Sequence, residues 1–178
     1  MEKAELRQLV REAKKRLSDD EKRESARIIG DRIEAQPCFV AARCILLYHS
    51  LPDEVDTRVW LARWQHVKEL YLPVVEDSNL VVRRYRQEEL SVGAFGICEP
   101  AGENLDDLSR IDLVIVPGMA FDSHRNRLGR GKGFYDKLLA HIQAPTIGVA
   151  YDCQLVPEIP AAPHDIPMTQ VISERRIF

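Results

Sequence analysis

Apolar residues recur along this chain at two spacings, one helical and one extended. Near the amino terminus they return every three or four residues with charged side chains between them, which predicts an amphipathic helix over residues 3–17. Ser18 and Glu21 then have the Ser-x-x-Glu spacing of a capping box, in which each side chain accepts a backbone N–H of the other residue. A second helix is therefore expected from this point to about Ala35, with Pro37 ending it.

Farther along, short apolar or alternating runs bounded by turn residues predict strands. Helical patterns lie between several of them, over about residues 57–67 and 134–142. Strands that alternate with helices indicate a parallel sheet covered on both faces. The expected fold is α/β, a three-layer sandwich with a largely parallel central sheet and helices on both faces, in a single domain over residues 1–178. The predicted strands are 44–48, 68–75, 80–85, 111–116, 146–151 and 170–172.

Composition narrows the class of partner. Lys and Arg number 25 against 28 Asp and Glu, a net charge of −3, so any anion site must be local and a nucleic-acid partner is not expected. The four cysteines form no C-x-x-C pair and no zinc-like pattern with histidine, which favours free thiols in a reducing compartment. With a charged amino terminus and no membrane-length apolar run, we expect a cytoplasmic protein without a membrane partner. We also expect it to be a monomer.

Positive charge is concentrated in residues 122–137, which contain five basic residues and two acidic ones. Gly129, Gly131 and Gly133 alternate with basic positions, and glycine both permits positive φ and leaves backbone N–H groups exposed. Such a loop between a strand and a helix suits a nucleoside triphosphate. The spacing is neither a P-loop nor a dinucleotide fingerprint, and a flexible turn with solvated charges is the weaker alternative. The basic residues are Arg125, Arg127, Arg130, Lys132 and Lys137.

Carboxylates and histidines supply further candidates. Glu54 follows a predicted strand, at the edge where open α/β sheets bind ligands, whereas Asp56 is expected to cap the next helix. His49 and His164 are better placed for a site than the histidines in helical patterns. Asp165 could share Mg²⁺ with a carboxylate of the basic loop, although such a residue is more often solvated.

Two stretches, DLVIVPGMAFD at 112–122 and RLGRGKGFYD at 127–136, resemble the 5-formyltetrahydrofolate cyclo-ligase family, also called methenyltetrahydrofolate synthetases. Further matches follow in family order over nearly the whole chain, including residues 54–57, 96–100 and 164–165. The resemblance implies conversion of 5-formyltetrahydrofolate to 5,10-methenyltetrahydrofolate with cleavage of ATP to ADP and phosphate. It also implies Mg²⁺ and phosphorylation of the formyl oxygen before N10 closes the ring.

The same resemblance implies residue roles. Arg127 and Lys132 would stabilise charge on the transferring phosphoryl group, and Asp136 and Asp165 would hold the metal. His49 is matched to the substrate wall only by its distance from Glu54. The implied ATP-binding residues are Lys3, Arg7, Arg127, Leu128, Gly129, Arg130, Gly131, Lys132, Gly133, Phe134 and Tyr135. The implied folate-binding residues are His49, Glu54, Arg130, Gly131, Lys132, Gly133 and Phe134.

Two other functions compete with this one. A phosphosugar or acyl-CoA enzyme of similar architecture would use the basic loop for a phosphate that is not transferred. A non-catalytic module would use it for anion binding, and the aromatic content of 7% argues against its nucleic-acid version.

Overall fold

A six-stranded sheet forms the middle of the protein in the computed structural model, which describes residues 1–93, 96–163 and 165–178. The strand order is β10-β9-β6-β1-β2-β3, and every neighbouring pair is parallel except β2 and β3. The largely parallel sheet is therefore confirmed. Its strands are β1 (Cys44–Leu46), β2 (Glu69–Glu76), β3 (Asn79–Arg84), β6 (Leu113–Pro117), β9 (Thr146–Val149) and β10 (Gln170–Ile172).

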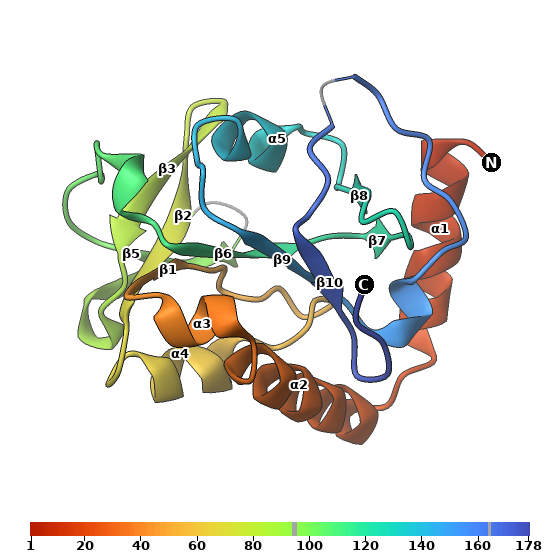
Figure 1. The fold of residues 1–178 in the computed structure, drawn as a ribbon, viewed down its shortest axis with the longest axis horizontal. Helices are drawn as coiled ribbons and strands as arrows, with labels where there is room; N and C mark the ends of the chain where they lie inside the picture. Colours follow the sequence, from red (N-terminus) through yellow and green to blue (C-terminus); the bar gives the residue numbers. More distant parts are fainter. Residues whose placement is uncertain (94–95, 164) are drawn as a thin grey trace.

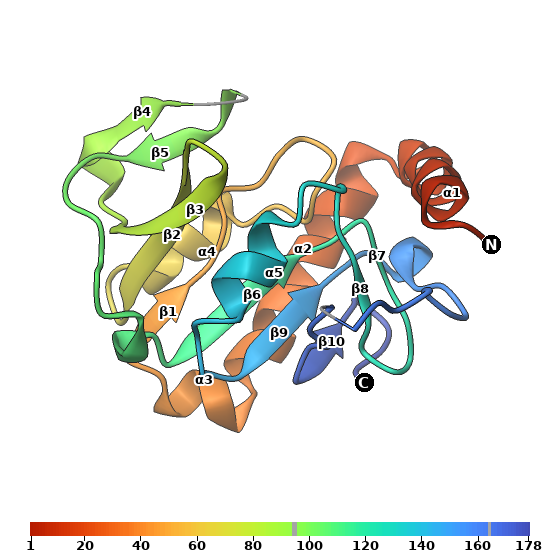
Figure 2. The same ribbon diagram turned by 90° about the horizontal axis from the view of Figure 1, so that it is seen from above.

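Helices cover both faces of this sheet (Figure 1, Figure 2). On one face, α2 and α4 bury Ile29 and Trp60 against Ile45 and other strand residues. On the other, α5 buries Leu138 against a separate cluster that contains Leu46. Successive residues of β1 thus serve different cores, as the two-residue period of a strand requires. The helices are α2 (Asp19–Glu34), α3 (Pro37–Ala41) and α4 (Arg58–Trp64) on the first face and α5 (Phe134–Leu139) on the second.

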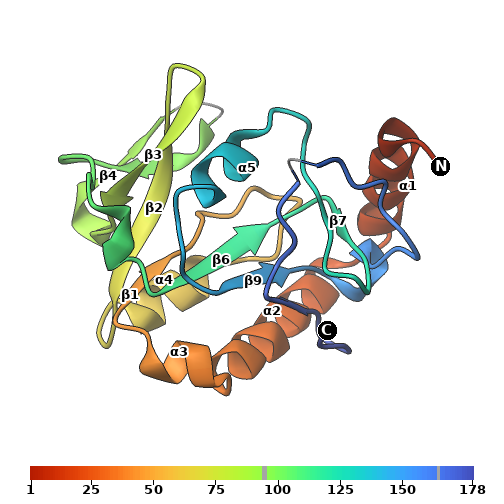
Figure 3. The same cartoon turned by 45° about the horizontal axis from the view of Figure 1, so that its top comes forward.

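The first helix, α1 (Lys3–Lys15), stands beside the sheet rather than on it (Figure 1, Figure 3). Its apolar stripe, with Leu6 and Val10, packs on Met119 and Leu128 of a third, smaller core. A short hairpin of β7 (Ala120–Phe121) and β8 (Arg127–Leu128) contributes residues to that core. The predicted amphipathic helix is confirmed, and its charged side remains available to a site.

Several boundaries differ from the sequence-based expectation for local physical reasons. The capping box of Ser18 and Glu21 is present, but Pro37 opens α3 because proline suits the first turn of a helix. Neither the β7–β8 hairpin nor the second hairpin was expected, since such short strands carry too few residues for a periodic signal. The second hairpin pairs β4 (Leu90–Val92) with β5 (Cys98–Pro100), and short 3₁₀ turns span Gln87–Glu89, Leu108–Arg110 and Asp152–Gln154.

The described residues bear on the cysteines and on membrane-spanning helices. The cysteines at positions 38, 44, 98 and 153 are free thiols there. Within the same residues, no helix is both long and apolar enough to cross a membrane.

Candidate active site

A cleft of about 500 Å³ opens at the carboxyl ends of β1 and β6, between α1 and the β4–β5 hairpin. Figure 2 shows α1 and that hairpin at opposite ends of the molecule, with the loops that follow the strands between them. Every residue to which a site role was assigned lines this cleft: Lys3, Arg7, His49, Glu54, Asp165 and the whole run 127–136. The structure thus brings together segments that lie far apart in the sequence.

The cleft also has an apolar wall, and most of it was missed by sequence reasoning. Tyr48, Leu51, Val75 and Leu80 line it together with residues 117–119 after β6. These are ordinary core residues by composition, so the one available signal was their position at the ends of predicted strands. Pro73, Ile97 and Glu99 also line the cleft, and the sequence had shown them only as matches in family order or as a turn.

Arg127 is the most buried cation of the basic loop, with its side chain 5% exposed. Its Nη2 donates to Asp136 Oδ1 at 2.8 Å, and its guanidinium carbon lies 5.5 Å from the centre of the Tyr135 ring. Its Nε is buried and has no hydrogen-bond partner among the described residues. A buried cation needs partners, and here one donor is left over.

The glycines of the loop have two different uses. Gly131 and Gly133 have φ values of 102° and 68°, as expected for a loop that needs the left-handed region. Gly129 does not use this freedom, because its φ is not positive. Its absent side chain makes room for Arg127 instead, because a Cβ at this position would lie 3.0 Å from Arg127 Nη1.

Only part of the local positive charge reaches the cleft. Arg127, Arg130 and Lys132 line it, and Lys132 Nζ lies 5.6 Å from the centre of the Phe134 ring. Arg125 does not line it and turns toward Thr169 O at 3.3 Å, while Lys137 lies 3.5 Å from Ser78 O. Three of the five basic residues of segment 122–137 therefore contribute positive charge to the cleft, fewer than the composition of the segment suggested.

The charged side of α1 closes one flank of the cleft. Arg7 Nε donates to the carbonyl oxygen of Gly129 at 2.8 Å, which fixes the start of the glycine-rich run. Lys3 Nζ pairs with Asp165 Oδ2 at 2.8 Å. Both cations were predicted at the site, and their contacts show that α1 also positions two of its loops.

Glu54 is held from several directions at once. Its Oε2 accepts the backbone N–H of Leu51 at 2.9 Å, and its own carbonyl accepts the Tyr151 hydroxyl at 3.0 Å. The Tyr48 hydroxyl donates to the next carbonyl, that of Val55, also at 3.0 Å. Burial raises the pKa of both tyrosines above the usual value for a phenol, so they remain donors.

Of the two candidates next to Glu54 in the sequence, His49 lines the cleft and Asp56 does not, as the sequence suggested. Asp56 does not line the cleft and accepts the backbone N–H of Arg58 at the start of α4. His49 lines it, and burial, with a smaller contribution from Arg58, lowers the pKa of its imidazole. His164 lies outside the described residues.

Asp136 and Asp165 are the carboxylates expected to hold a metal. Both line the cleft, and each makes an ion pair, with Arg127 and Lys3 respectively. The described residues contain no group of three His, Cys, Asp or Glu side chains arranged for a metal. Two carboxylate oxygen donors suit Mg²⁺ that is bound together with nucleotide phosphates, since this ion commonly keeps few protein ligands.

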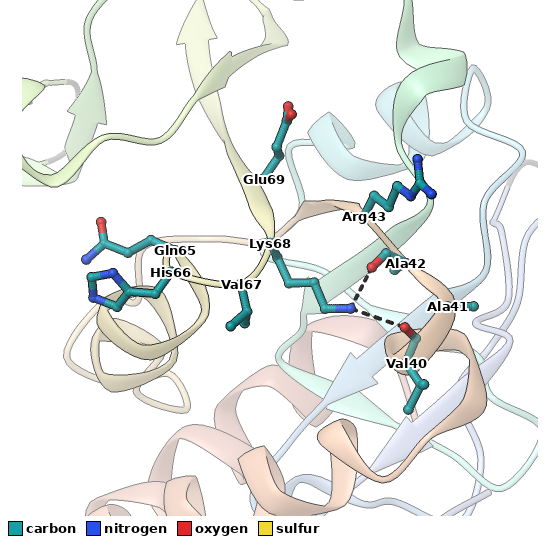
Figure 4. A pocket seen from close by; sticks show the side chains of 9 residues that line it. All are labelled: Val40, Ala41, Ala42, Arg43, Gln65, His66, Val67, Lys68 and Glu69. Atoms are coloured by element: carbon teal, nitrogen blue, oxygen red, sulfur yellow. Dashed lines mark hydrogen bonds between the residues drawn. The ribbon is translucent and has the colours of Figure 1, made fainter.

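A second hollow of about 470 Å³ lies near the amino ends of β1 and β2 (Figure 4). Lys68 crosses it and donates to the carbonyl oxygens of Phe39, Val40 and Ala42, at 2.8, 3.3 and 2.6 Å. These carbonyls end α3, where a cation is favourable. The hollow is therefore explained by helix capping, and no residue assigned to the site lies in it.

Comparison with known proteins places this cleft in a family. Residues 1–174 match the sequence model of the 5-formyltetrahydrofolate cyclo-ligase family. The chain belongs to this family. The Escherichia coli K12 cyclo-ligase is 32% identical over 180 residues, which cover 96% of this chain and 99% of the relative. The mouse cyclo-ligase is 28% identical over 189 residues, covering 97% and 91% of the two chains.

Solved structures of cyclo-ligases, under their other name, share the architecture. The NMR structure of Aquifex aeolicus 5,10-methenyltetrahydrofolate synthetase superposes with a TM-score of 0.90 at 35% identity, covering 99% of this chain and 92% of that one. The synthetase of Mycoplasma pneumoniae has a TM-score of 0.80 at 23% identity, covering 98% and 99%. The three-layer fold is thus a property of the family.

Proposed function

We propose that this cyclo-ligase family member converts 5-formyltetrahydrofolate to 5,10-methenyltetrahydrofolate while cleaving ATP to ADP and phosphate. Besides family membership, the observation that carries the proposal is that charged and apolar groups line the same cleft. Arg127, Arg130 and Lys132 supply positive charge to it, the Glu54 carboxylate lies beside Arg130, and Tyr48, Leu51, Val75 and Leu80 supply apolar surface. Such a cleft suits a polyphosphate next to a largely flat heterocycle.

The reaction needs activation of a poor leaving group. The formyl oxygen attacks the γ-phosphorus, an O–P bond forms, and the bond from that phosphorus to the β–γ bridging oxygen breaks to release ADP. N10 then attacks the formyl carbon, and phosphate departs with the former formyl oxygen. Loss of the N10 proton leaves the positive charge shared over N5, the carbon and N10.

The basic loop would stabilise the first of these steps. Phosphoryl transfer is catalysed mainly by positioning and by fixed positive charge at the phosphate oxygens. Lys132 is exposed on the loop and can reach a phosphate. Arg127 pairs with Asp136, and its Nε has no partner in the described part of the chain. We assign ATP binding to these two residues together with Lys3, Arg7 and the rest of 128–135, and charge stabilisation to Arg127 and Lys132.

The remaining roles follow from position in the cleft. Glu54 and His49 would contact the folate, with residues 130–134 bordering both substrates. Asp136 and Asp165 would hold Mg²⁺, which neutralises phosphate charge when bound with ATP. A monomeric state and a cytoplasmic location stay predictions, the first checked by light scattering of the purified protein.

The test is a direct assay. Purified protein receives 5-formyltetrahydrofolate, ATP and Mg²⁺, and the near-ultraviolet absorbance of the methenyl product is followed together with phosphate release. We expect both products in equal amounts, and neither when one component is omitted. A folded sample that forms no product would contradict the proposal and favour a phosphosugar or acyl-CoA substrate, or an anion-binding module without catalysis.

A further inference from the structure

The last turn of α1 carries a buried cation to which neither the sequence nor the family resemblance assigned a role. Lys14 is 3% exposed, as buried as the apolar residues around it. Its Nζ donates to Asp53 twice, to Oδ2 at 2.7 Å and to the backbone carbonyl oxygen at 2.8 Å. Burial of an ammonium group is costly without such partners, so this pair holds both Lys14 and the loop that carries Asp53 in place.

The other oxygen of the same carboxylate contacts the glycine-rich loop. Asp53 Oδ1 accepts from Arg130 Nη2 at 2.6 Å, and the same nitrogen lies 3.2 Å from Glu54 Oε1. Burial alone would raise the pKa of Asp53, but the hydrogen bonds and charges of Lys14 and Arg130 outweigh it and lower that pKa. One carboxylate thus joins α1 to the glycine-rich loop.

In the described part of the chain, the Arg130 side chain is directed mainly by Asp53 and Glu54. The residue lies between Gly129 and Gly131, and Arg7 fixes the loop only at the carbonyl of Gly129. The Arg130 side chain is 43% exposed, and a long flexible side chain in that setting loses rotamer entropy when it is ordered. Its direction therefore depends on the two carboxylates that it contacts.

We propose that Lys14 and Asp53 are positioning residues: Lys14 fixes Asp53, and Asp53 holds Arg130 so that its charge is shared rather than placed wholly on Glu54. This inference rests on the proposed function, in which Glu54 contacts the folate. Without Asp53, the Arg130 guanidinium would hydrogen-bond to Glu54 alone. It would then compete with the folate for the Glu54 carboxylate. The loss should appear in folate binding more than in the chemical step.

The experiment is a double-mutant cycle of D53N and R130Q, with kcat and KM measured for both substrates. We expect D53N to raise the KM for 5-formyltetrahydrofolate about fivefold, the size of one partly exposed charge pair, with kcat and the KM for ATP changed less than about twofold. In the R130Q background the same substitution should have no further effect on that KM. K14M should raise it in the same direction.

Asp56 supplies the matched control, because it lies in the same loop and pairs with Arg58 outside the cleft. D56N should leave the KM for the folate within about twofold of the wild type, since it disturbs the loop but not Arg130. An equal rise in KM for D56N and D53N would overturn the proposal. So would a D53N effect of the same size with and without Arg130.

A measurement without substrates separates this inference from the proposed function. In spectra of protein labelled with ¹⁵N-arginine, the Arg130 guanidinium signal is assigned by its disappearance in R130Q. We expect it to be distinct in the wild type and averaged by motion in D53N and K14M. Wild-type protein without turnover would contradict the proposed function alone, whereas an Arg130 signal unchanged in D53N would overturn the positioning role alone.

Discussion

At the scale of single residues, burial decides how a basic side chain of this site can be studied. Arg127 is both a packed core residue and a charge in the cleft, since it fills the space beside Gly129 and pairs with Asp136. Its removal would leave a cavity and an unpaired carboxylate, so lost activity would not reveal its chemical role. Lys132 is exposed on the same loop and allows a cleaner test.

For Lys132→Ala we expect kcat to fall about 100-fold, because a charge at the transferring phosphoryl group is lost. The free energy of unfolding should change by less than about 0.5 kcal/mol, as for other exposed positions. Steady-state kinetics and urea unfolding measure the two effects. Lys137→Ala is the control, since Lys137 is exposed on α5 and does not line the cleft, and unchanged turnover in Lys132→Ala would remove the assigned role.

For Asp136→Asn we expect two separate losses. The Mg²⁺ concentration for half-maximal activity should rise about tenfold, because an amide oxygen carries no charge for a hard cation. The free energy of unfolding should also fall by about 1–3 kcal/mol, because Arg127 loses its charged partner. A Mg²⁺ titration at fixed ATP measures the first, and a curve that overlays the wild type would exclude Asp136 from the metal site.

At the scale of elements, length determined what the sequence could predict. The amphipathic α1, the capping box of α2 and the strands of the central sheet each repeat a pattern over enough residues to be recognised. The β7–β8 hairpin has two residues in each strand, and its turn is set by Asp122, which accepts N–H groups from His124 and Asn126. Side-chain contacts of that kind do not appear in hydrophobic periodicity.

The glycine-rich loop gives a prediction at this scale. Gly131 and Gly102 have nearly the same φ, 102° and 99°, but only Gly131 lines the cleft. Alanine at either position should cost about 1–3 kcal/mol of stability, because the strain is that of the backbone alone. Neither new Cβ would clash, since the nearest atoms to position 131 are those of the Arg7 guanidinium at 3.6 Å.

Only Gly131→Ala should also lower kcat/KM, by about tenfold, because displacement of the loop misplaces its charges. Unfolding in urea and initial rates of methenyl product formation measure the pair of effects. Equal activity losses in the two variants would show that the conformation of Gly131 has no special part in the site.

At the scale of the whole molecule, the site is assembled from segments that the sequence separates widely. One cleft is lined by Lys3, Glu54, Arg130 and Asp165. They meet there because the parallel sheet places the carboxyl ends of its strands at one edge, and α1 packs beside that edge. The residues alone indicated the basic loop, the strand end with His49 and Glu54, and, more weakly, His164 and Asp165. The order of motifs in the family added Lys3 and Arg7, while the Lys14–Asp53 pair required the folded structure.

The same assembly gives a pH dependence that belongs to the molecule as a whole. Tyr48, Tyr135 and Tyr151 have pKa values raised by burial, and the negative charge of Glu54 adds to the rise for the first two. The unfolded chain releases these protons near pH 10 and the native protein does not, so the stabilisation is complete below pH 10 and is lost as the pH rises. Each such phenol should lower the free energy of unfolding by about 1.4 kcal/mol per pH unit above that point.

Tyr151→Phe tests this directly. Below pH 10 the variant should be less stable because the hydrogen bond to the Glu54 carbonyl is lost, and its decline above pH 10 should be shallower by the contribution of one phenol. Urea unfolding followed by tryptophan fluorescence from pH 8 to 11 measures both terms, and equal slopes for the two proteins between pH 8 and 9 serve as the internal control. If the slopes also agree above pH 10, the Tyr151 phenol ionises in the native protein as readily as in the unfolded chain, and its burial beside the cleft does not hold its proton.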